Sequence, residues 1–171
     1  MSAISAKHLE NFELLSNLTG EERASFSSKI KEKHYSAGKV VFTEGDEGGV
    51  IFFLLSGEVE ITQSLTLSMS KSVEHDSRDK SIIRLSGEQH AIIGEVSLVG
   101  GEEKRTATVT ALTNCRMGLM TAKDFYTILD ANPEIGYKVM RNLGRIITGR
   151  LLTANKNVLK LTTALSLILE K

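Results

Sequence analysis

The chain has 171 residues, the size of one domain with appendages, which is enough to bury a hydrophobic core. Its 21 basic and 21 acidic residues give a net charge of zero, so no long-range field attracts nucleic acid or an acidic membrane. The N-terminus has no basic start followed by an apolar core, and the longest aliphatic and aromatic run, 50–55, is too short to cross a bilayer. We therefore expect a cytoplasmic protein without direct contact to nucleic acid or membrane.

The first segment, residues 1–32, is predicted to be helical. Leu9, Phe12 and Leu15 fall on one face of a helix. The spacing from Thr19 to Glu22 is that of a capping box, which predicts the start of a second short helix. We expect this segment to cover one end of the domain that follows.

Residues 33–120 predict a small jelly-roll β-barrel, so the fold class is mainly β with flanking helices. Glycine turns recur along this segment and separate short runs rich in Val, Ile, Phe and Thr. Asp46 lies in one such turn and is expected to cap backbone amides. Cys115 lies in an alternating run, which predicts a buried small hydrophobic residue and not a reactive thiol. The serine-rich, mixed-charge stretch 62–81 predicts a long hairpin loop.

The stretch from Ile93 to Ala107 contains the parts of a small anion pocket in consecutive order. Gly94 permits a strained backbone, and Glu95 follows it at the start of a short apolar turn. The first amides of such a turn lack partners and carry the positive end of the peptide dipoles. Arg105 adds a planar group that is always charged and suits a phosphate. This combination predicts an anion site, although Arg105 and Glu95 could also form a simple surface ion pair.

The same stretch resembles the phosphate-binding cassette of cyclic-nucleotide-binding domains, and the spacing from Glu95 to Arg105 is similar to that of the bacterial catabolite activator branch. The resemblance implies that Glu95 binds the ribose 2′-hydroxyl, while Arg105 and the amides of the short helix hold the cyclic phosphate. It implies cAMP or cGMP as the ligand, with a preference for cAMP, and no cofactor. Ser97 replaces the family's usual alanine. The predicted ligand contacts are Gly94, Glu95, Val96, Ser97, Arg105, Thr106 and Ala107.

The last segment, residues 121–171, is predicted to be helical, with a short helix from Lys123 to Asp130, a break at Asn132 and Pro133, and a long helix after it. Gly144 and Gly149 weaken the long helix and suggest a bend or hinge. An apolar stripe runs along it for about 48 Å, and its second half extends beyond the barrel, which favours a homodimer. The stripe comprises Met140, Leu143, Ile147, Leu151, Ala154, Val158, Leu161, Leu165 and Ile168.

These features together predict a stand-alone cyclic-nucleotide sensor that signals through its C-terminal helix to an unidentified effector protein. Thr148, Arg150 and Thr153 are the candidates for a second contact, to the base. We expect no catalytic residues, no enzyme activity and no metal site, because the four histidines lie in separate segments without paired spacing. There is no room after Lys171 for a helix-turn-helix domain. The alternative is a ligand-free relative that acts as a dimerising scaffold, with Arg105 and Glu95 bound only to each other.

Overall fold

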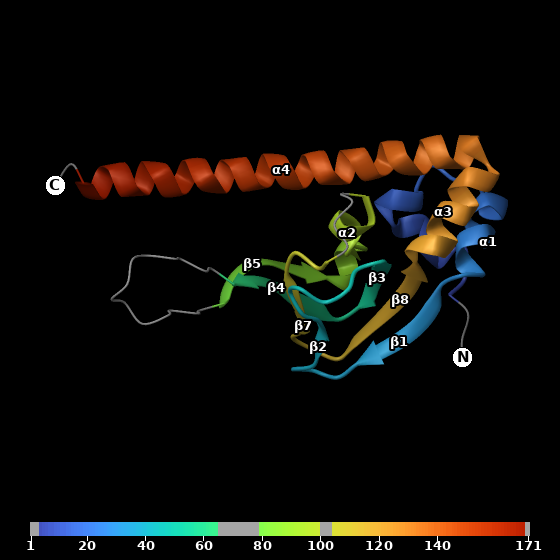
Figure 1. Cartoon of the computed structure of the whole chain (residues 1–171), viewed down its shortest axis with the longest axis horizontal. Helices are drawn as coiled ribbons and strands as arrows, with labels where there is room; N and C mark the ends of the chain where they lie inside the picture. Colours follow the sequence, from blue (N-terminus) through green and yellow to red (C-terminus); the bar gives the residue numbers. More distant parts are fainter. Residues whose placement is uncertain (1–3, 65–78, 100–103, 170–171) are drawn as a thin grey trace.

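Two four-stranded antiparallel sheets form the body of the molecule, as the sequence predicted. The computed structural model describes residues 4–64, 79–99 and 104–169. Helices from the N-terminal segment and from just after the barrel lie at one end of the sheets, and a long C-terminal helix runs alongside the sheets (Figure 1). One sheet has the strand order β1-β8-β3-β6 and the other β2-β7-β4-β5. The first comprises β1 (Lys31–Tyr35), β8 (Cys115–Thr121), β3 (Val50–Ser56) and β6 (Ile92–Ile93), and the second comprises β2 (Val40–Phe42), β7 (Thr108–Ala111), β4 (Glu58–Ser64) and β5 (Asp79–Ser86).

The core consists of two apolar clusters, one between the sheets and one beneath the helices. Phe52, Leu54 and Met117 of the first sheet pack against side chains of the second sheet, such as Val59 and Val109. Cys115 is buried in this cluster, as predicted, and burial raises the pKa of its thiol. The second cluster joins residues of β3 and β8 to the N-terminal segment and to the helices that follow the barrel.

The N-terminal segment differs from the prediction in its first half. It forms two 3₁₀ turns, η1 (His8–Asn11) and η2 (Glu13–Leu15), before the helix α1 (Gly20–Ser27). Phe12 between the two turns is extended, and this break in the helix lets Leu9, Phe12 and Leu15 all reach the core. The predicted capping box is confirmed, because the Thr19 hydroxyl accepts from the Glu22 amide and the Glu22 carboxylate accepts from the Thr19 amide.

The hairpin of β4 and β5 extends further than the sequence suggested. The two strands pair from Glu58 and Ser86 to Ser64 and Asp79, so both enter the predicted loop 62–81. Backbone hydrogen bonds hold such an antiparallel pair together even where the side chains are polar. The rest of the predicted loop, residues 65–78, lies outside the described residues. A short 3₁₀ turn, η3 (Gly87–Gln89), connects β5 to β6.

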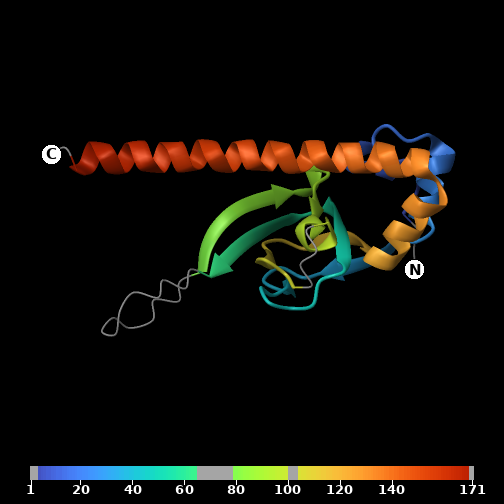
Figure 2. The ribbon, with the colours of Figure 1, turned by 45° about the horizontal axis from the view of Figure 1, so that its top comes forward.

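After the barrel come α3 (Ala122–Ala131) and α4 (Pro133–Leu169). The predicted break between them is confirmed, and the Asn132 side chain caps α4 by accepting from the amides of Glu134 and Ile135. α4 is continuous over 37 residues, a range that includes Gly144 and Gly149, and its ribbon shows no sharp bend in either view (Figure 2). In the described part of the chain, no helix, α4 included, is long and apolar enough to cross a membrane.

Side chains from the N-terminal segment fix the first turns of α4. The buried Asn142 amide donates to the Leu14 carbonyl at 3.1 Å and accepts from Asn17 at 3.2 Å. Lys138 forms ion pairs with Glu22 at 2.9 Å and with Glu134 at 3.1 Å. From residue 151 to residue 169, in contrast, every described residue of α4 is exposed. α4 is therefore packed against the N-terminal segment in its first turns and exposed in its outer half.

Candidate functional site

The predicted cassette lies at the edge of the first sheet, where β6 leads into a short helix. β6 pairs with β3, after which Gly94 turns the chain into α2 (Glu95–Val99). Gly94 has a φ of +89°, and a Cβ at this position would lie 2.6 Å from Arg105 Nη1 and 2.8 Å from the Val50 carbonyl oxygen. Glycine is therefore needed here for two reasons: the backbone is left-handed, and the guanidinium passes directly over it.

Arg105 is a buried cation held mainly by neutral groups. Its side chain donates from Nη1 to the Ser97 hydroxyl at 3.0 Å and from Nη2 to the Val50 carbonyl at 2.9 Å. The guanidinium carbon lies 4.3 Å from the centre of the Phe42 ring. Burial lowers the pKa of Arg105, while the charges of Asp46 and Glu95 partly oppose that shift.

No ion pair among the described residues includes Arg105, and its Nε has no hydrogen-bond partner there. Arg105 as a whole is only 5% exposed. A buried cation without a carboxylate partner is costly unless an anion approaches it. The surroundings of Arg105 thus fit an anion site better than a structural ion pair.

Glu95, the first residue of α2, is buried and pairs with Arg150 and not with Arg105. Arg150 of α4 reaches across to it, so that Nη1 contacts Glu95 Oε1 while Nη2 donates to the Ile92 carbonyl at 2.7 Å. The ion pair of Glu95 with Arg105, which was part of the scaffold alternative, is therefore not present among the described residues. Arg150 joins α4 to the cassette and lines both pockets, so its predicted base contact stays a prediction.

A small pocket and a larger pocket meet at this place. The small pocket has a volume of about 210 Å³ and is lined by all of the contacts predicted for the cassette. The larger one, about 650 Å³, lies between α4, the β4–β5 hairpin and η3. Arg150 and Ile61 line both pockets, so they mark the boundary between them. The lining of the small pocket is Phe42, Ile61, Ile93, Gly94, Glu95, Val96, Ser97, Arg105, Thr106, Ala107, Val109 and Arg150.

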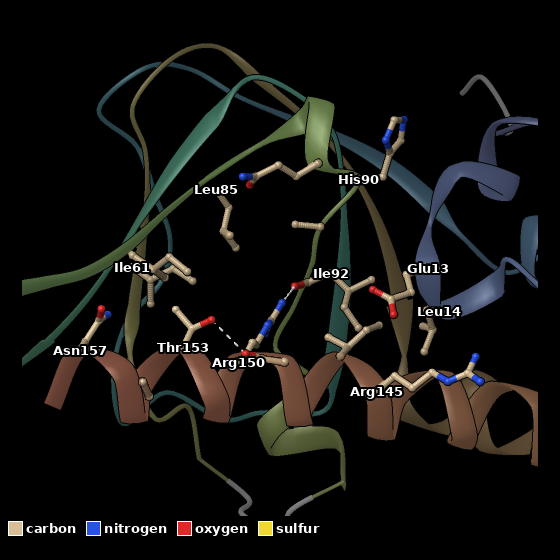
Figure 3. A pocket seen from close by; sticks show the side chains of 16 residues that line it. Glu13, Leu14, Ile61, Leu85, His90, Ile92, Arg145, Arg150, Thr153 and Asn157 are labelled. Atoms are coloured by element: carbon tan, nitrogen blue, oxygen red, sulfur yellow. Dashed lines mark hydrogen bonds between the residues drawn. The ribbon is translucent and has the colours of Figure 1, made fainter. Parts of the chain in front are cut away.

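The structure separates the three candidates on α4. Figure 3 shows Arg150 and Thr153 pointing from the helix into the larger pocket. Thr148 is exposed and lines neither pocket, because two positions along a helix turn it about 200° away from Arg150, whereas four or seven positions bring a residue back to the same face. The same rule places Asn157 beside Arg150 and Thr153. Asn157 was not among the predicted contacts. Counting seven positions on from Arg150 would have found it.

Two more contacts hold Arg105 in place, and neither could be found from the sequence. Phe42, on β2, covers one face of the Arg105 guanidinium, and no local pattern indicates which aromatic ring does so. The Asp46 side chain accepts from the Thr43 amide at 2.7 Å, as a capping residue should, and its carbonyl accepts from the Arg105 amide at 2.8 Å. This turn thus holds the backbone of Arg105. In the described ranges, no three His, Cys, Asp or Glu side chains converge so that they could hold a metal ion.

Comparison with known proteins identifies a matching family and several structures with a similar fold. The model of the cyclic nucleotide-binding domain family matches residues 32–132. A cyclic nucleotide-binding domain from Methylobacillus flagellatus shares the fold with a TM-score of 0.76 and 21% identity, covering 91% of this chain and 84% of that one. The catabolite activator protein of Thermus thermophilus has a TM-score of 0.69 and 22% identity, covering 88% and 63%. Glutaminase 1 of Bradyrhizobium diazoefficiens is 27% identical over 88% of this chain, which spans 22% of that relative.

Proposed function

The chain belongs to the cyclic nucleotide-binding domain family, and we propose that it is a regulatory module that binds cAMP or cGMP and transmits this binding through α4. We propose that it binds its ligand without catalysing a reaction. The observation that carries the proposal is the buried guanidinium of Arg105, which lines the small pocket without an ion-pair partner among the described residues.

The charges around the small pocket complement a cyclic phosphate. Arg105 and Arg150 each contribute one positive charge and Glu95 contributes one negative charge, so together they leave a net charge of +1. A cyclic phosphodiester carries a single negative charge and can accept charge-assisted hydrogen bonds from a planar guanidinium. We place the phosphate at Arg105 and the amides of α2, with the ribose at Glu95.

The larger pocket suits the base. Its walls include the apolar side chains of Ile61, Leu85 and Ile92, which can cover the faces of a flat ring (Figure 3). Its polar groups lie on α4, where Thr153 and Asn157 face the cavity, and on the opposite wall, where Glu13, Gln89 and His90 line it. A mostly apolar pocket with a few polar groups that fix orientation is the usual form of a small-molecule site. In this pose the ligand contacts the barrel and α4 together.

Titration calorimetry with cAMP and cGMP tests the proposal on the wild type and on Arg105→Ala. A charge-assisted hydrogen bond contributes about 1.5–3 kcal/mol, so we expect the variant to lose at least about tenfold in affinity. Arg116→Ala is the matched control, because Arg116 lies on β8 and pairs with Glu32 at the surface. Equal affinity in the wild type and in Arg105→Ala would contradict the assignment of the pocket.

For the base, we propose a preference for cAMP. Its support is the spacing from Glu95 to Arg105, which is similar to that of the catabolite activator branch. In competition experiments, cAMP should displace labelled cGMP at a lower concentration than cGMP displaces labelled cAMP. The reverse order would assign the module to cGMP.

We also propose that two copies pair along the outer half of α4 and that an effector protein responds to the rearranged helix. Residues spaced by seven form two rows on this half: Leu151, Val158 and Leu165 in one, and Ala154, Leu161 and Ile168 in the other. The large side chains in these rows are 56–70% exposed. This is the a/d pattern of a coiled coil, and burial of each such side chain is worth about 1.5–3 kcal/mol. A second copy supplies that burial by symmetry.

A further inference from the structure

We infer that Arg150 is a positioning residue that acts through Glu95. It holds the Glu95 carboxylate ready for a ligand hydroxyl and thereby links ligand binding to the docking of α4. This inference rests on the proposed function for its ligand, and it assigns to Arg150 a role different from the base contact that the sequence suggested.

The geometry around Glu95 fixes one side of the carboxylate and leaves the other side available. Arg150 Nη1 contacts Oε1, and the second arm of the same guanidinium donates to the Ile92 carbonyl at 2.7 Å. Oε2 accepts no hydrogen bond from any described residue, although Glu95 lines the small pocket. Each carboxylate oxygen offers two lone pairs, so a ligand hydroxyl can donate to Oε2 while Arg150 keeps Oε1. Arg150 and the ligand can therefore bind Glu95 together.

The two-armed contact also orients Glu95. Because Nη2 is fixed by a backbone carbonyl of β6, the planar guanidinium cannot rotate without losing a bond. The carboxylate oxygen bound to Nη1 then faces a donor whose position is fixed. Lys at position 150 would keep the charge but could not reproduce this fork.

Arg150 also ties the outer part of α4 to the barrel. Beyond Leu143, every hydrogen bond that joins α4 to a strand or to α2 within the described ranges comes from Arg150. Ligand binding at Glu95 and docking of α4 therefore share one contact. By reciprocity, whatever free energy the docked helix adds to ligand binding, the ligand adds to docking.

A double-mutant cycle with two ligands tests the inference. The proteins are the full-length wild type, Arg150→Gln, Glu95→Gln and the double variant, titrated with cAMP and with 2′-deoxy-cAMP. Arg141→Gln is the matched control, because Arg141 lies on the same helix, is exposed, lines neither pocket and contacts neither Glu95 nor Ile92.

Arg150→Gln should weaken cAMP binding by about tenfold or more. The loss for 2′-deoxy-cAMP should be at least about threefold smaller, because that ligand has no hydroxyl for Glu95 and feels only the altered charge. In the Glu95→Gln background, Arg150→Gln should change affinity by less than about twofold, since its effect passes through the carboxylate. Arg150→Lys should restore only part of the affinity.

Three outcomes would overturn the inference. Equal losses from Arg150→Gln with and without Glu95 would mean that Arg150 contacts the ligand directly. Tighter binding by Arg150→Gln would mean that Arg150 competes with the ligand. Equal losses for the two ligands would mean that the hydroxyl is not involved.

Hydrogen exchange of the α4 amides at residues 147–156, measured without ligand, tests the link to α4 separately. Arg150→Gln, Glu95→Gln and the double variant should each accelerate exchange several-fold and by similar factors, while Arg141→Gln should not. Unchanged exchange in these variants would refute the link between Glu95 and α4. A wild type that binds neither nucleotide would refute the proposed function and the ligand role of Arg150 with it, whereas a wild type that binds while the cycle is additive would refute the inference alone.

Discussion

Substitution of Gly94 by alanine should destabilise the fold through two separable effects. The first is the left-handed backbone, since Gly94 has a φ of +89° and an alanine in this region costs about 1–2 kcal/mol. The second is crowding, because the new Cβ would lie 2.6 Å from Arg105 Nη1 and 2.8 Å from the Val50 carbonyl oxygen. The carbonyl belongs to a central strand and cannot retreat, so the guanidinium has to move.

Moving the guanidinium sacrifices the hydrogen bonds of Arg105 to Ser97 and to the Val50 carbonyl. Hydrogen bonds to charged groups contribute about 1.5–3 kcal/mol each, and partial loss of both gives an additional cost of about 2–4 kcal/mol. We therefore expect Gly94→Ala to lower the free energy of unfolding by about 3–6 kcal/mol in total. The displaced guanidinium should also bind cyclic nucleotide more weakly.

The matched control is Gly38→Ala, which carries the backbone effect alone. Gly38 has a φ of +78°, and a Cβ there would meet no atom within 4 Å. Urea unfolding followed by circular dichroism should show a loss of about 1–2 kcal/mol for Gly38→Ala and clearly more for Gly94→Ala, with similar m-values. Equal losses in the two variants would refute the close approach of Arg105 to Gly94.

Other predictions concern α4 and its anchors. Asn142→Ala should cost about 2–4 kcal/mol in thermal unfolding, because it leaves the Leu14 carbonyl without its buried partner; a change within 0.5 kcal/mol would contradict that role. Lys138 lowers the pKa of Glu22 in the folded state, so the contribution of Glu22 is present above its unfolded pKa and is lost as the pH falls through the folded one. The difference in unfolding midpoint between the wild type and Glu22→Gln should thus shrink from about pH 7 to about pH 3, and a constant difference would contradict the pairing. Sedimentation should show a concentration-dependent dimer for the wild type and a monomer for Leu161→Glu, whereas a wild type that is monomeric at high micromolar concentration would exclude the pairing of α4.

The predictions that the structure confirmed depend on residues that lie close together in the sequence. The capping box at Thr19 and Glu22 requires only residues three positions apart, and the helix break at Asn132 follows from the proline after it. The jelly roll followed from regular glycine turns between short apolar runs. The cassette was recognisable because Gly94, Glu95 and Arg105 lie within one short stretch of sequence.

The contacts that sequence could not give join residues far apart in the chain. Glu95 and Arg150 are 55 positions apart, and an arginine at position 105 is an equally reasonable partner until the path of α4 is known. The ring of Phe42 over Arg105 likewise depends on how β2 lies against the cassette. For Thr148 the residue type was suitable, but the phase of the helix turns it away from the pockets.

Two of the three buried polar side chains in the described part of the chain mark the points at which α4 is held. They are Asn142, which binds the N-terminal segment, and Glu95, which binds Arg150 and lines the small pocket. The bond of Asn142 goes to a backbone carbonyl, that of Leu14, so it should persist while the contact of Glu95 with Arg150 responds to a ligand. The two contacts on α4 lie about 12 Å apart along the helix, and the end at Leu169 is about 40 Å from Asn142. If the contact at Arg150 changed, α4 would pivot about Asn142, and a displacement at Arg150 would be enlarged about threefold at the far end of the apolar rows, near Ile168.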